Sequence, residues 1–248
     1  MTSVARRRFF VNEIRSGTAE LRGDQARHLS RVLRAEPGQQ YEISDSRSAY
    51  LAEILEARVD RVVFRVLEAL DSPEMPVQIT LLAGLIKFDR FEWMIEKTTE
   101  LGVDRILPVE TARSEKGLVK ASEKRVERWA RIAREASQQA RRLRAPEILP
   151  AAGLEAALAE PADCHYVLEE ASAPPLLQQL PSARHRGVRV AMLVGPEGGW
   201  TDAERRLTAT AGWLPVSLGP QVVRAETAAA AAVAVVTSAW CARKMPLQ

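Results

Sequence analysis

The stretch VAMLVGPEGGWTDAERRLTATAGWLPVSLGPQVVRAET, residues 190–227, decides the fold of the larger part of the chain. It contains one arrangement twice: a short apolar run that breaks into a Gly-Pro turn and is followed by a helix start. The first unit runs from Val190–Val194 into Gly195–Gly199, and the second from Val216–Leu218 into Gly219-Pro220. Two such units predict a sheet with both glycine-bearing loops at the carboxyl ends of its strands. In open α/β sheets this edge binds ligands.

Strands and helices alternate through the whole of residues 77–248, which predicts an α/β domain with a mostly parallel sheet. Asp89 is the expected cap of a helix that Gly102 ends, and Thr201 with Glu204 has the pattern of a capping box. The other segments expected here are strands at 78–86, 105–109, 148–150 and 166–169, and helices at 122–143, within 174–187 and at 227–241. The long basic helix is expected to turn Val126, Trp129, Ala133, Ala136 and Ala140 inward.

Residues 1–72 are expected to form a smaller, β-rich domain. A helix at 24–34 is predicted to bury Leu29, Val32 and Leu33 on one face. The expected strands are 8–11, 40–44, 49–55 and 61–67. Such a unit, closed into a small barrel, is a frequent host for nucleic acid. Residues 71–76, with two prolines in four positions, are predicted to be the linker.

The net charge of +3 is unevenly distributed. Residues 113–144 hold 11 basic and four acidic residues, so this segment carries +7 and the rest of the chain is net acidic. Concentrated positive charge attracts a phosphate backbone. The alternative is a solvated helix face with i,i+4 pairs. The run Arg141-Arg142-Leu143-Arg144 favours nucleic acid, because no acidic residue follows it until Glu147.

Several protein classes are disfavoured by the sequence. Cys164 and Cys241 form no disulfide framework, so a reducing cytoplasm is expected. The N-terminus has no apolar signal-peptide core, and residues 227–241 are too short to span a bilayer. The chain has three histidines, His28, His165 and His185. They fit neither a catalytic triad nor the spacing of metal ligands, so a triad hydrolase and a bound metal are not expected.

The two glycine-bearing loops match no nucleotide fingerprint. Gly195–Gly199 lacks the Lys-Ser/Thr ending of a P-loop and the G-x-G-x-x-G spacing of a dinucleotide site. Glycines still let main-chain groups approach a ligand closely. Two ordinary turns are the alternative interpretation.

Both loops closely resemble the signature loops of the RsmE family, in Leu193–Gly199 and in Leu218–Ala228. Members of this family are SPOUT-class methyltransferases that methylate N3 of a uridine in 16S ribosomal RNA, using S-adenosylmethionine. The resemblance covers nearly the whole chain, because further segments match in order: Arg7–Val11, His28–Arg34, Lys87–Val103, Thr111–Ser114 and Arg144–Ile148.

The resemblance implies an architecture that the residue patterns alone do not supply. It implies a SPOUT-type parallel sheet with a C-terminal trefoil knot in 77–248, and a PUA-like, RNA-binding β-barrel in 1–72. It also implies a homodimer with the active site at the interface, and the small ribosomal subunit with its 16S rRNA as the partner. The apolar helix at 227–241 fits a dimer, because an all-apolar helix needs burial on several sides.

The resemblance also assigns residues to roles. The expected cofactor-binding residues are Leu193, Val194, Gly195, Pro196, Glu197, Gly198, Gly199, Leu218, Gly219, Val223, Arg224, Glu226 and Thr227. The expected RNA-binding residues are Arg7, Arg8, His28, Arg34, Arg113, Arg141, Arg142 and Arg144.

Two residues are the candidates for catalysis. Arg224 is expected to stabilise the anion that forms when the uridine imide loses its proton. The alternative is a salt bridge from Arg224 to Glu226 or Glu197 that only shapes the loop. Glu197 is the candidate for the base, and Glu226-Thr227 is alternatively a cap of the last helix.

The chain departs from the family pattern at Gln221, where an arginine is usual, and at Ala225, where a threonine is usual. Two rival hypotheses are considered. The first is a catalytically silent RNA-binding or ribosome-assembly protein, and it rests on the basic helix and on Gln221. The second is a SPOUT enzyme that modifies another RNA site, and the full set of matching motifs argues against it.

Overall fold

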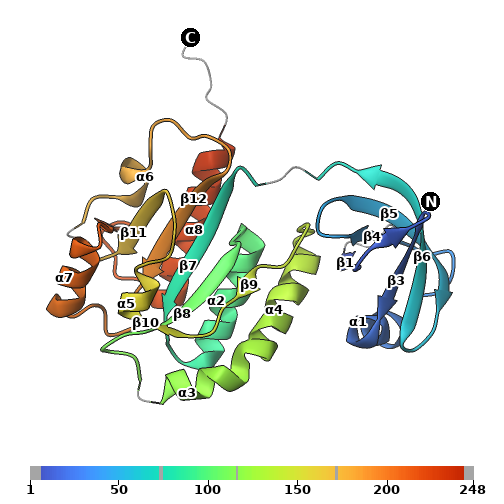
Figure 1. The fold of residues 1–248 in the computed structure, drawn as a ribbon, viewed down its shortest axis with the longest axis horizontal. Coiled ribbons are helices and arrows are strands. Elements are labelled where there is room, and N and C mark those ends of the chain that lie inside the picture. Colours follow the sequence, from blue (N-terminus) through green and yellow to red (C-terminus); the bar gives the residue numbers. More distant parts are fainter. Residues whose placement is uncertain (1–6, 73–74, 116, 171–172, 243–248) are drawn as a thin grey trace, which may run out of the picture. The chain divides into compact units, whose positions relative to one another are not determined.

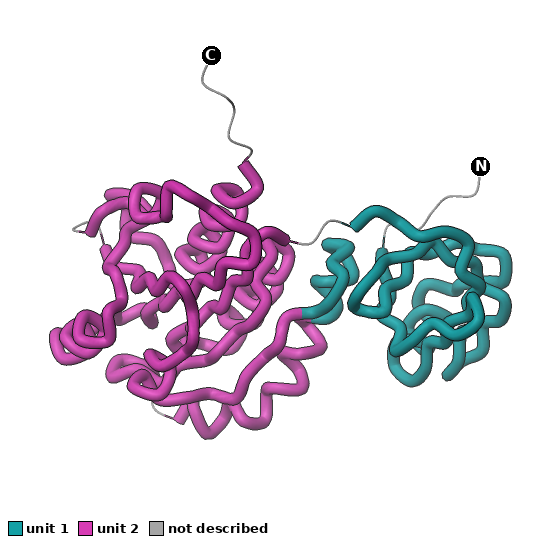
Figure 2. The backbone as a smooth tube through the Cα atoms, turned by 45° about the horizontal axis from the view of Figure 1, so that its top comes forward, with its two compact units in different colours: residues 1–74, 134–145 teal, residues 75–133, 146–248 magenta. Residues whose placement is uncertain are grey.

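The computed structural model describes residues 7–72, 75–115, 117–170 and 173–242. The chain divides into two compact units, drawn in teal and magenta in Figure 2. Unit 1 comprises residues 1–74 and 134–145, and unit 2 comprises residues 75–133 and 146–248. Two residues of the linker expected at 71–76, Pro73 and Glu74, lie outside the described residues. Unit 1 therefore contains a segment from the middle of the chain that the contiguous division at residue 72 does not include.

Unit 1 is built on a six-stranded sheet. The order of its strands is β1 (Arg8–Phe10), β4 (Gln40–Ser44), β5 (Ala49–Ala57), β6 (Arg61–Leu70), β3 (Thr18–Arg22) and β2 (Ile14–Arg15). β1 is parallel to β4, and the other neighbours are antiparallel. Two register shifts between β5 and β6 add local bending. The sheet encloses an apolar core that includes Phe9, Ile43, Ile54 and Phe64.

The prediction of one regular helix at 24–34 is wrong for its second half. α1 (Gly23–Arg27) continues as a π-helix over His28–Val32, and the Leu33 amide donates to the His28 carbonyl at 3.1 Å. The wider π turn changes the angular position of the residues that follow. Leu29 is fully buried as expected, but Val32 is 65% exposed and Leu33 is 37% exposed.

A buried carboxylate joins the sheet of unit 1 to residues 134–145. Glu42 accepts hydrogen bonds from Arg8 Nε and Nη2 at 3.2 and 3.0 Å. Its other oxygen pairs with Arg141 Nη1 at 3.2 Å. Nearby, Ser44 Oγ donates to the Leu143 carbonyl at 2.8 Å. The segment 134–145 belongs to unit 1 because its polar groups complete this network.

Unit 2 contains the parallel sheet predicted from the sequence (Figure 1). The order of its strands is β10 (Ala152–Gly153), β8 (Arg105–Glu110), β7 (Val77–Gly84), β12 (Val188–Val194), β11 (Cys164–Leu168) and β13 (Leu214–Val216), and β9 (Glu147–Ile148) also pairs with β8. Every pairing is parallel.

Both faces of this sheet are buried. Along β12, Val190, Met192 and Val194 enter one core, and Ala191 and Leu193 enter the other. The first core lies against α2 (Phe88–Leu101), α4 (Val126–Gln139), α6 (Leu176–Gln179) and α8 (Ala225–Cys241). The second core includes α5 (Leu154–Ala157) and the two tryptophans that flank α7 (Asp202–Thr210). Burial on both faces explains why the strands read as continuous apolar runs.

Some helix boundaries follow the sequence signals. Thr201 and Glu204 form the expected capping box at the start of α7. Gly102 ends α2 in the left-handed conformation, with φ of 111°.

Other helix boundaries differ from the expectation. α2 begins after Lys87, and Asp89 lies in its first turn instead of capping it. The N-cap of α8 is Arg224, so Glu226 and Thr227 lie inside the helix.

The long basic helix expected at 122–143 is broken. It consists of α3 (Leu118–Ser122), a 3-10 turn (Glu123–Arg125) and α4, which ends at Gln139. Ala140, expected to face inward, is exposed, and Arg141 has a positive φ of 53°. Trp129, Ala133 and Ala136 are buried as expected. Among the described residues, no helix has the length and apolarity needed to cross a bilayer.

We expect Glu42→Gln to destabilise unit 1 by about 3 kcal/mol, because a neutral amide leaves two arginines without a full countercharge in a buried position. Denaturant unfolding followed by tryptophan fluorescence and by far-UV circular dichroism measures this change. Glu13→Gln is the control: Glu13 pairs with Arg15 at 2.8 Å on an exposed surface. That substitution is expected to change stability by less than about 0.5 kcal/mol. Equal effects of the two substitutions would contradict the role given to Glu42.

Candidate functional site

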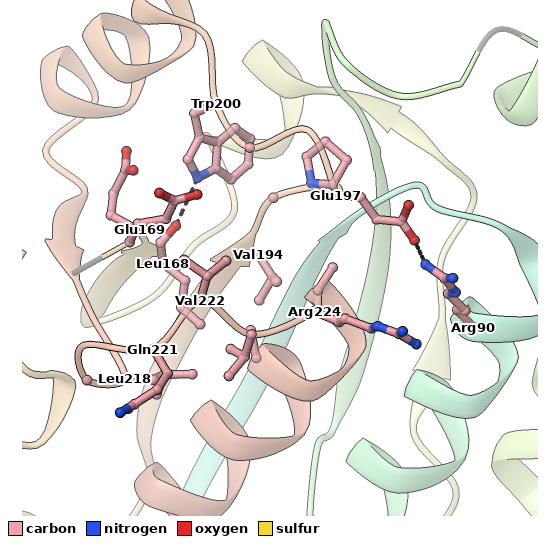
Figure 3. Close-up of a pocket in the computed structure, with 18 of the residues that line it drawn as sticks. Arg90, Leu168, Glu169, Val194, Glu197, Trp200, Leu218, Gln221, Val222 and Arg224 are labelled. Carbon is pink, nitrogen blue, oxygen red and sulfur yellow. Dashed lines mark hydrogen bonds and ion pairs between the residues drawn. The ribbon is translucent and has the colours of Figure 1, made fainter. Parts of the chain in front are cut away.

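A cavity of about 430 Å³ lies at the carboxyl edge of the sheet in unit 2 (Figure 3). Its walls are the ends of β11 and β12, the glycine loop Gly195–Gly199, the second loop Leu218–Arg224 and the first turn of α8. Arg90 of α2 and Arg205 of α7 complete the lining. The edge position agrees with the site predicted from the two strand–loop–helix units.

The structure brings most of the expected cofactor-binding residues to this cavity. Those that line it are Val194, Gly195, Pro196, Glu197, Gly199, Leu218, Gly219, Val223 and Arg224. The other four do not line it. Leu193 is buried in the core on the opposite face of the sheet, Gly198 lies against Arg113, Glu226 is buried, and Thr227 is exposed.

Sequence reasoning did not select several lining residues. They are Arg90, Leu168, Glu169, Glu170, Trp200, Arg205, Gln221, Val222, Ala225 and Ala228. Leu168 ends β11 and Glu169-Glu170 follows it, so the same strand-end rule applied to that strand would have indicated these residues. Arg90 and Arg205 carry no such signal, because they reach the cavity from helices.

Two glycines allow the glycine loop to approach its neighbours. A Cβ on Gly84, at the end of β7, would lie 2.8 Å from the backbone nitrogen of Pro196. A Cβ on Gly195 would lie 3.0 Å from the ring of Trp200. Both distances are below or at the limit that real Cβ atoms show. The main chain of Gly195-Pro196 is therefore held directly against β7, where a side chain would displace it.

The far side of the cavity is fixed by the end of β11. The indole nitrogen of Trp200 donates to the Leu168 carbonyl at 2.9 Å. Arg205 donates to both oxygens of Glu169, at 2.9 and 3.2 Å, and this hydrogen bonding raises the pKa of the Arg205 guanidinium. Glu170 lines the same wall and is exposed.

The cationic groups of the cavity differ in their partners. Arg90 forms an ion pair with Glu197, drawn as a dashed line in Figure 3. Arg224 is exposed, lines the cavity and has neither an ion pair nor a side-chain hydrogen bond with any of the described residues. Of the two interpretations of Arg224, the salt bridge to Glu226 or Glu197 is therefore absent from this part of the chain. Arg224 remains available to a ligand.

The residues expected to bind RNA have different environments. Arg7 and Arg34 are exposed, and Arg7 Nη1 lies 3.5 Å from Nε2 of the half-buried His28. Arg8 is 5% exposed and its guanidinium is occupied by Glu42. Arg113 is exposed, yet its Nη1 donates to the Gly198 carbonyl at 2.5 Å. Of the remaining three, Arg141 is paired with Glu42, Arg142 is half-buried and Arg144 is exposed.

His165 lies on β11 with its ring 4.9 Å from that of Trp213. Its Nε2 lies 2.9 Å from the Glu160 carbonyl. No cluster of histidine, cysteine, aspartate or glutamate that could hold a metal ion occurs among the described residues.

Residues 73–237 match a family model described as an RNA methyltransferase domain. The ribosomal RNA small subunit methyltransferase E of Bacillus subtilis is 33% identical over 222 residues, which cover 85% of this chain and 86% of that protein. This chain belongs to the RsmE family. A further member of the family, from Mycobacterium tuberculosis, is 32% identical over 94% of this chain and 92% of its own length.

Two solved structures are similar to this chain over nearly its whole length. One is the ribosomal RNA small subunit methyltransferase E of Neisseria gonorrhoeae bound to S-adenosyl methionine. It has a TM-score of 0.84 and 30% identity, with 94% of this chain and 98% of that chain covered. The other, from Legionella pneumophila, is in complex with the cofactor SAM. It has a TM-score of 0.83 and 31% identity, with 94% and 96% covered.

We expect Gly84→Ala to destabilise unit 2 by about 2 kcal/mol, because the new methyl group would overlap the Pro196 backbone and force β7 and the glycine loop apart. Gly153→Ala is the matched control, since its Cβ would meet no atom within 4 Å and its φ of −67° suits alanine. Urea unfolding of both variants measures the difference. Equal stability of the two variants would show that the contact is not tight.

Proposed function

We propose that this protein methylates N3 of a uridine in 16S rRNA of the small ribosomal subunit, with S-adenosylmethionine as the methyl donor. The observation that carries the proposal is the cavity between the two glycine-bearing loops, with the unpaired Arg224 on its wall. Membership of the RsmE family supports the reaction class. A cytoplasmic location is part of the proposal, because the substrate belongs to the ribosome.

The lining residues suit S-adenosylmethionine. A volume of about 430 Å³ lies within the range of sites for small molecules. Leu168, Val194 and Leu218 offer apolar walls for a planar base, and Gly195 and Gly219 expose main-chain groups for polar contacts. The carboxylate of Glu170 on the rim is suited to hydroxyl or ammonium groups.

The chain's own groups can assist methyl transfer at the cavity. When bound, the cofactor supplies an electrophilic sulfonium methyl group. Uridine N3 becomes a nucleophile only when its imide proton leaves, and the negative charge then spreads to the neighbouring carbonyl oxygens. Arg224 is proposed to stabilise that charge, and the absence of a neutralising carboxylate among the described residues supports this role. Glu197 is proposed to accept the proton, and Arg90, its ion-pair partner, fixes the position of its carboxylate.

The proposal assigns RNA binding to unit 1 and to the basic segment 113–144. Unit 1 is proposed to be a PUA-like barrel that contacts phosphate through the exposed Arg7 and Arg34 and the half-buried His28. The burial of Arg8 against Glu42 favours a structural role for this residue, with the exposed arginines making the phosphate contacts.

A trefoil knot and a homodimer are also part of the proposal. The parallel order β7-β12-β11-β13 and the passage of the second loop beside the glycine loop support a knotted C-terminal segment. α8 carries a partly exposed stripe of small apolar residues, Ala230, Ala231, Ala234 and Val235, which supports burial against a second copy. A solution mass equal to that of one chain would refute the homodimer.

Deleting the gene in its host is expected to leave one uridine of 16S rRNA without its N3 methyl group. This methyl group blocks Watson–Crick pairing, so primer extension stops at the modified position in the wild type and reads through in the deletion strain. Mass mapping of the fragment identifies the base, and add-back of the gene restores the stop. An unchanged 16S modification pattern in the deletion strain would exclude the proposed function.

We expect Arg224→Ala to lower kcat by about 10²- to 10³-fold, because the developing anion loses its cationic partner. S-adenosylmethionine binding, measured by calorimetry, should change far less. Arg224→Lys should recover part of the rate, since it keeps the charge. Arg206→Ala is the control, because Arg206 is also exposed, on α7, but does not line the cavity. Wild-type turnover by Arg224→Ala would remove this residue from the mechanism.

A further inference from the structure

Glu204 makes more contacts than a helix cap requires. It lies in the first turn of α7 and is 5% exposed. Its Oε2 accepts from the Thr201 amide and hydroxyl, both at 2.8 Å, which completes the capping box. Its Oε1 accepts from the Ala112 amide at 2.8 Å, in a segment 92 residues earlier in the chain. One carboxylate therefore joins the start of α7 to the loop that follows β8.

The segment that Glu204 reaches is a closed turn, here named turn 111–114. The Thr111 amide donates to Ser114 Oγ at 3.2 Å, and the Ser114 amide donates to the Thr111 carbonyl at 3.1 Å. The two hydroxyl groups lie 2.9 Å apart, within hydrogen-bond distance. Thr111 is buried. These bonds fix the conformation of the turn independently of Glu204.

Turn 111–114 also contacts the glycine loop directly. Arg113 donates to the Gly198 carbonyl at 2.5 Å. A Cβ on Gly198 would lie 3.1 Å from the Arg113 Cβ, so the two backbones approach closely. The turn is thus joined to the loop at Gly198 and, through Glu204, to helix α7, which begins four residues after Gly198.

A loop rich in glycine has many accessible conformations, and ordering it on binding reduces affinity. The Gly84 contact fixes the start of the glycine loop at Gly195-Pro196. The end of the loop, Gly198-Gly199, has no contact of that kind with β7 among those described. Turn 111–114 supplies the contacts that hold this end.

We propose that Glu204 is a positioning residue for cofactor binding. It holds turn 111–114 against the glycine loop and so presets the main-chain groups that contact S-adenosylmethionine. The inference rests on the proposed function, because it requires the cofactor to bind in this cavity. Glu204 itself does not line the cavity and acts through Ala112, Thr201 and, across the turn, Arg113.

Glu204→Gln tests the proposal with little change of shape. A glutamine amide has one acceptor oxygen, so its NH₂ group must face either the Ala112 or the Thr201 amide. Calorimetry of the full chain with S-adenosylmethionine, without RNA, is expected to give a Kd about 10- to 100-fold higher than for the wild type. In turnover assays the KM for the cofactor should rise, while kcat at saturating cofactor stays within about threefold of the wild type.

Glu42→Gln is the matched control, because Glu42 is a carboxylate of similar burial, 6% exposed, in unit 1. It should lower stability and leave the cofactor Kd unchanged. Thr201→Ala separates the clamping of the turn from the capping of α7, because it removes the hydroxyl cap and keeps the Oε1 contact. It should raise the Kd less than threefold. An equal rise for Thr201→Ala and Glu204→Gln would overturn the proposal.

Arg113→Met provides a second variant if Glu204→Gln does not fold. Arg113 is exposed, and methionine keeps the apolar stem that packs on Gly198. It should raise the cofactor Kd, and an unchanged Kd would overturn the proposal.

Amide hydrogen exchange of residues 195–199, measured without cofactor, distinguishes this inference from the proposed function. Faster exchange in Glu204→Gln and in Arg113→Met, but not in Glu42→Gln, supports the positioning role. Unchanged exchange overturns it. A wild-type protein that binds no S-adenosylmethionine would refute the proposed function and the positioning role together, whatever the exchange rates.

Discussion

The cavity depends on the close approach of two backbones at the ends of neighbouring strands. Gly84 ends β7 and meets the Gly195-Pro196 peptide after β12, with no room for a Cβ between them. This contact directs the chain across the sheet edge instead of outward into solvent. Trp200 can then reach the Leu168 carbonyl on the far side, which closes the wall formed by β11. The hollow between these points is where the second loop and Arg224 enter.

The arginines around the cavity differ in whether a carboxylate neutralises them. Each of two arginines that line it has a carboxylate partner, Glu197 for Arg90 and Glu169 for Arg205. These pairs shape the walls and leave little free charge, because each cation is largely neutralised by its partner. Arg224 differs because it is the N-cap of α8 and forms no ion pair or side-chain hydrogen bond with any of the described residues. A cation without a countercharge, in a partly enclosed space, is suited to bind a developing anion.

In unit 1, charge pairing instead takes up arginines that were expected to be free for RNA. Glu42 is buried and therefore needs cationic partners, which it finds in Arg8 and in Arg141 from a distant part of the chain. Two arginines expected from sequence to face RNA thus contribute to the cohesion of the unit. Burying the carboxylate without them would be costly, since an unpaired charge in the interior loses its hydration.

Local signals in the sequence predicted local structure well. The capping box at Thr201, the left-handed Gly102 and the buried strands of the parallel sheet each depend on neighbours within a few residues, so they could be read directly. The failures occurred where the backbone changed its period or where a tertiary contact replaced a local one. The π turn after α1 exposed Val32 and Leu33, and Lys87 took the N-cap position expected for Asp89.

At the candidate site, too, some features follow from local sequence and others only from the tertiary structure. The sequence by itself determined the alternation of strands and helices along the α/β part of the chain and the two glycine-bearing loops at the strand ends. It also determined the family to which these loops belong. Only the tertiary structure decided which residues share the cavity, which arginine is unpaired, and that residues 134–145 belong to unit 1. Periodicity and turn chemistry act over a few residues and are therefore visible in the sequence. The pairing of charges and the approach of backbones join residues that are far apart in the chain, and only the folded packing determines them.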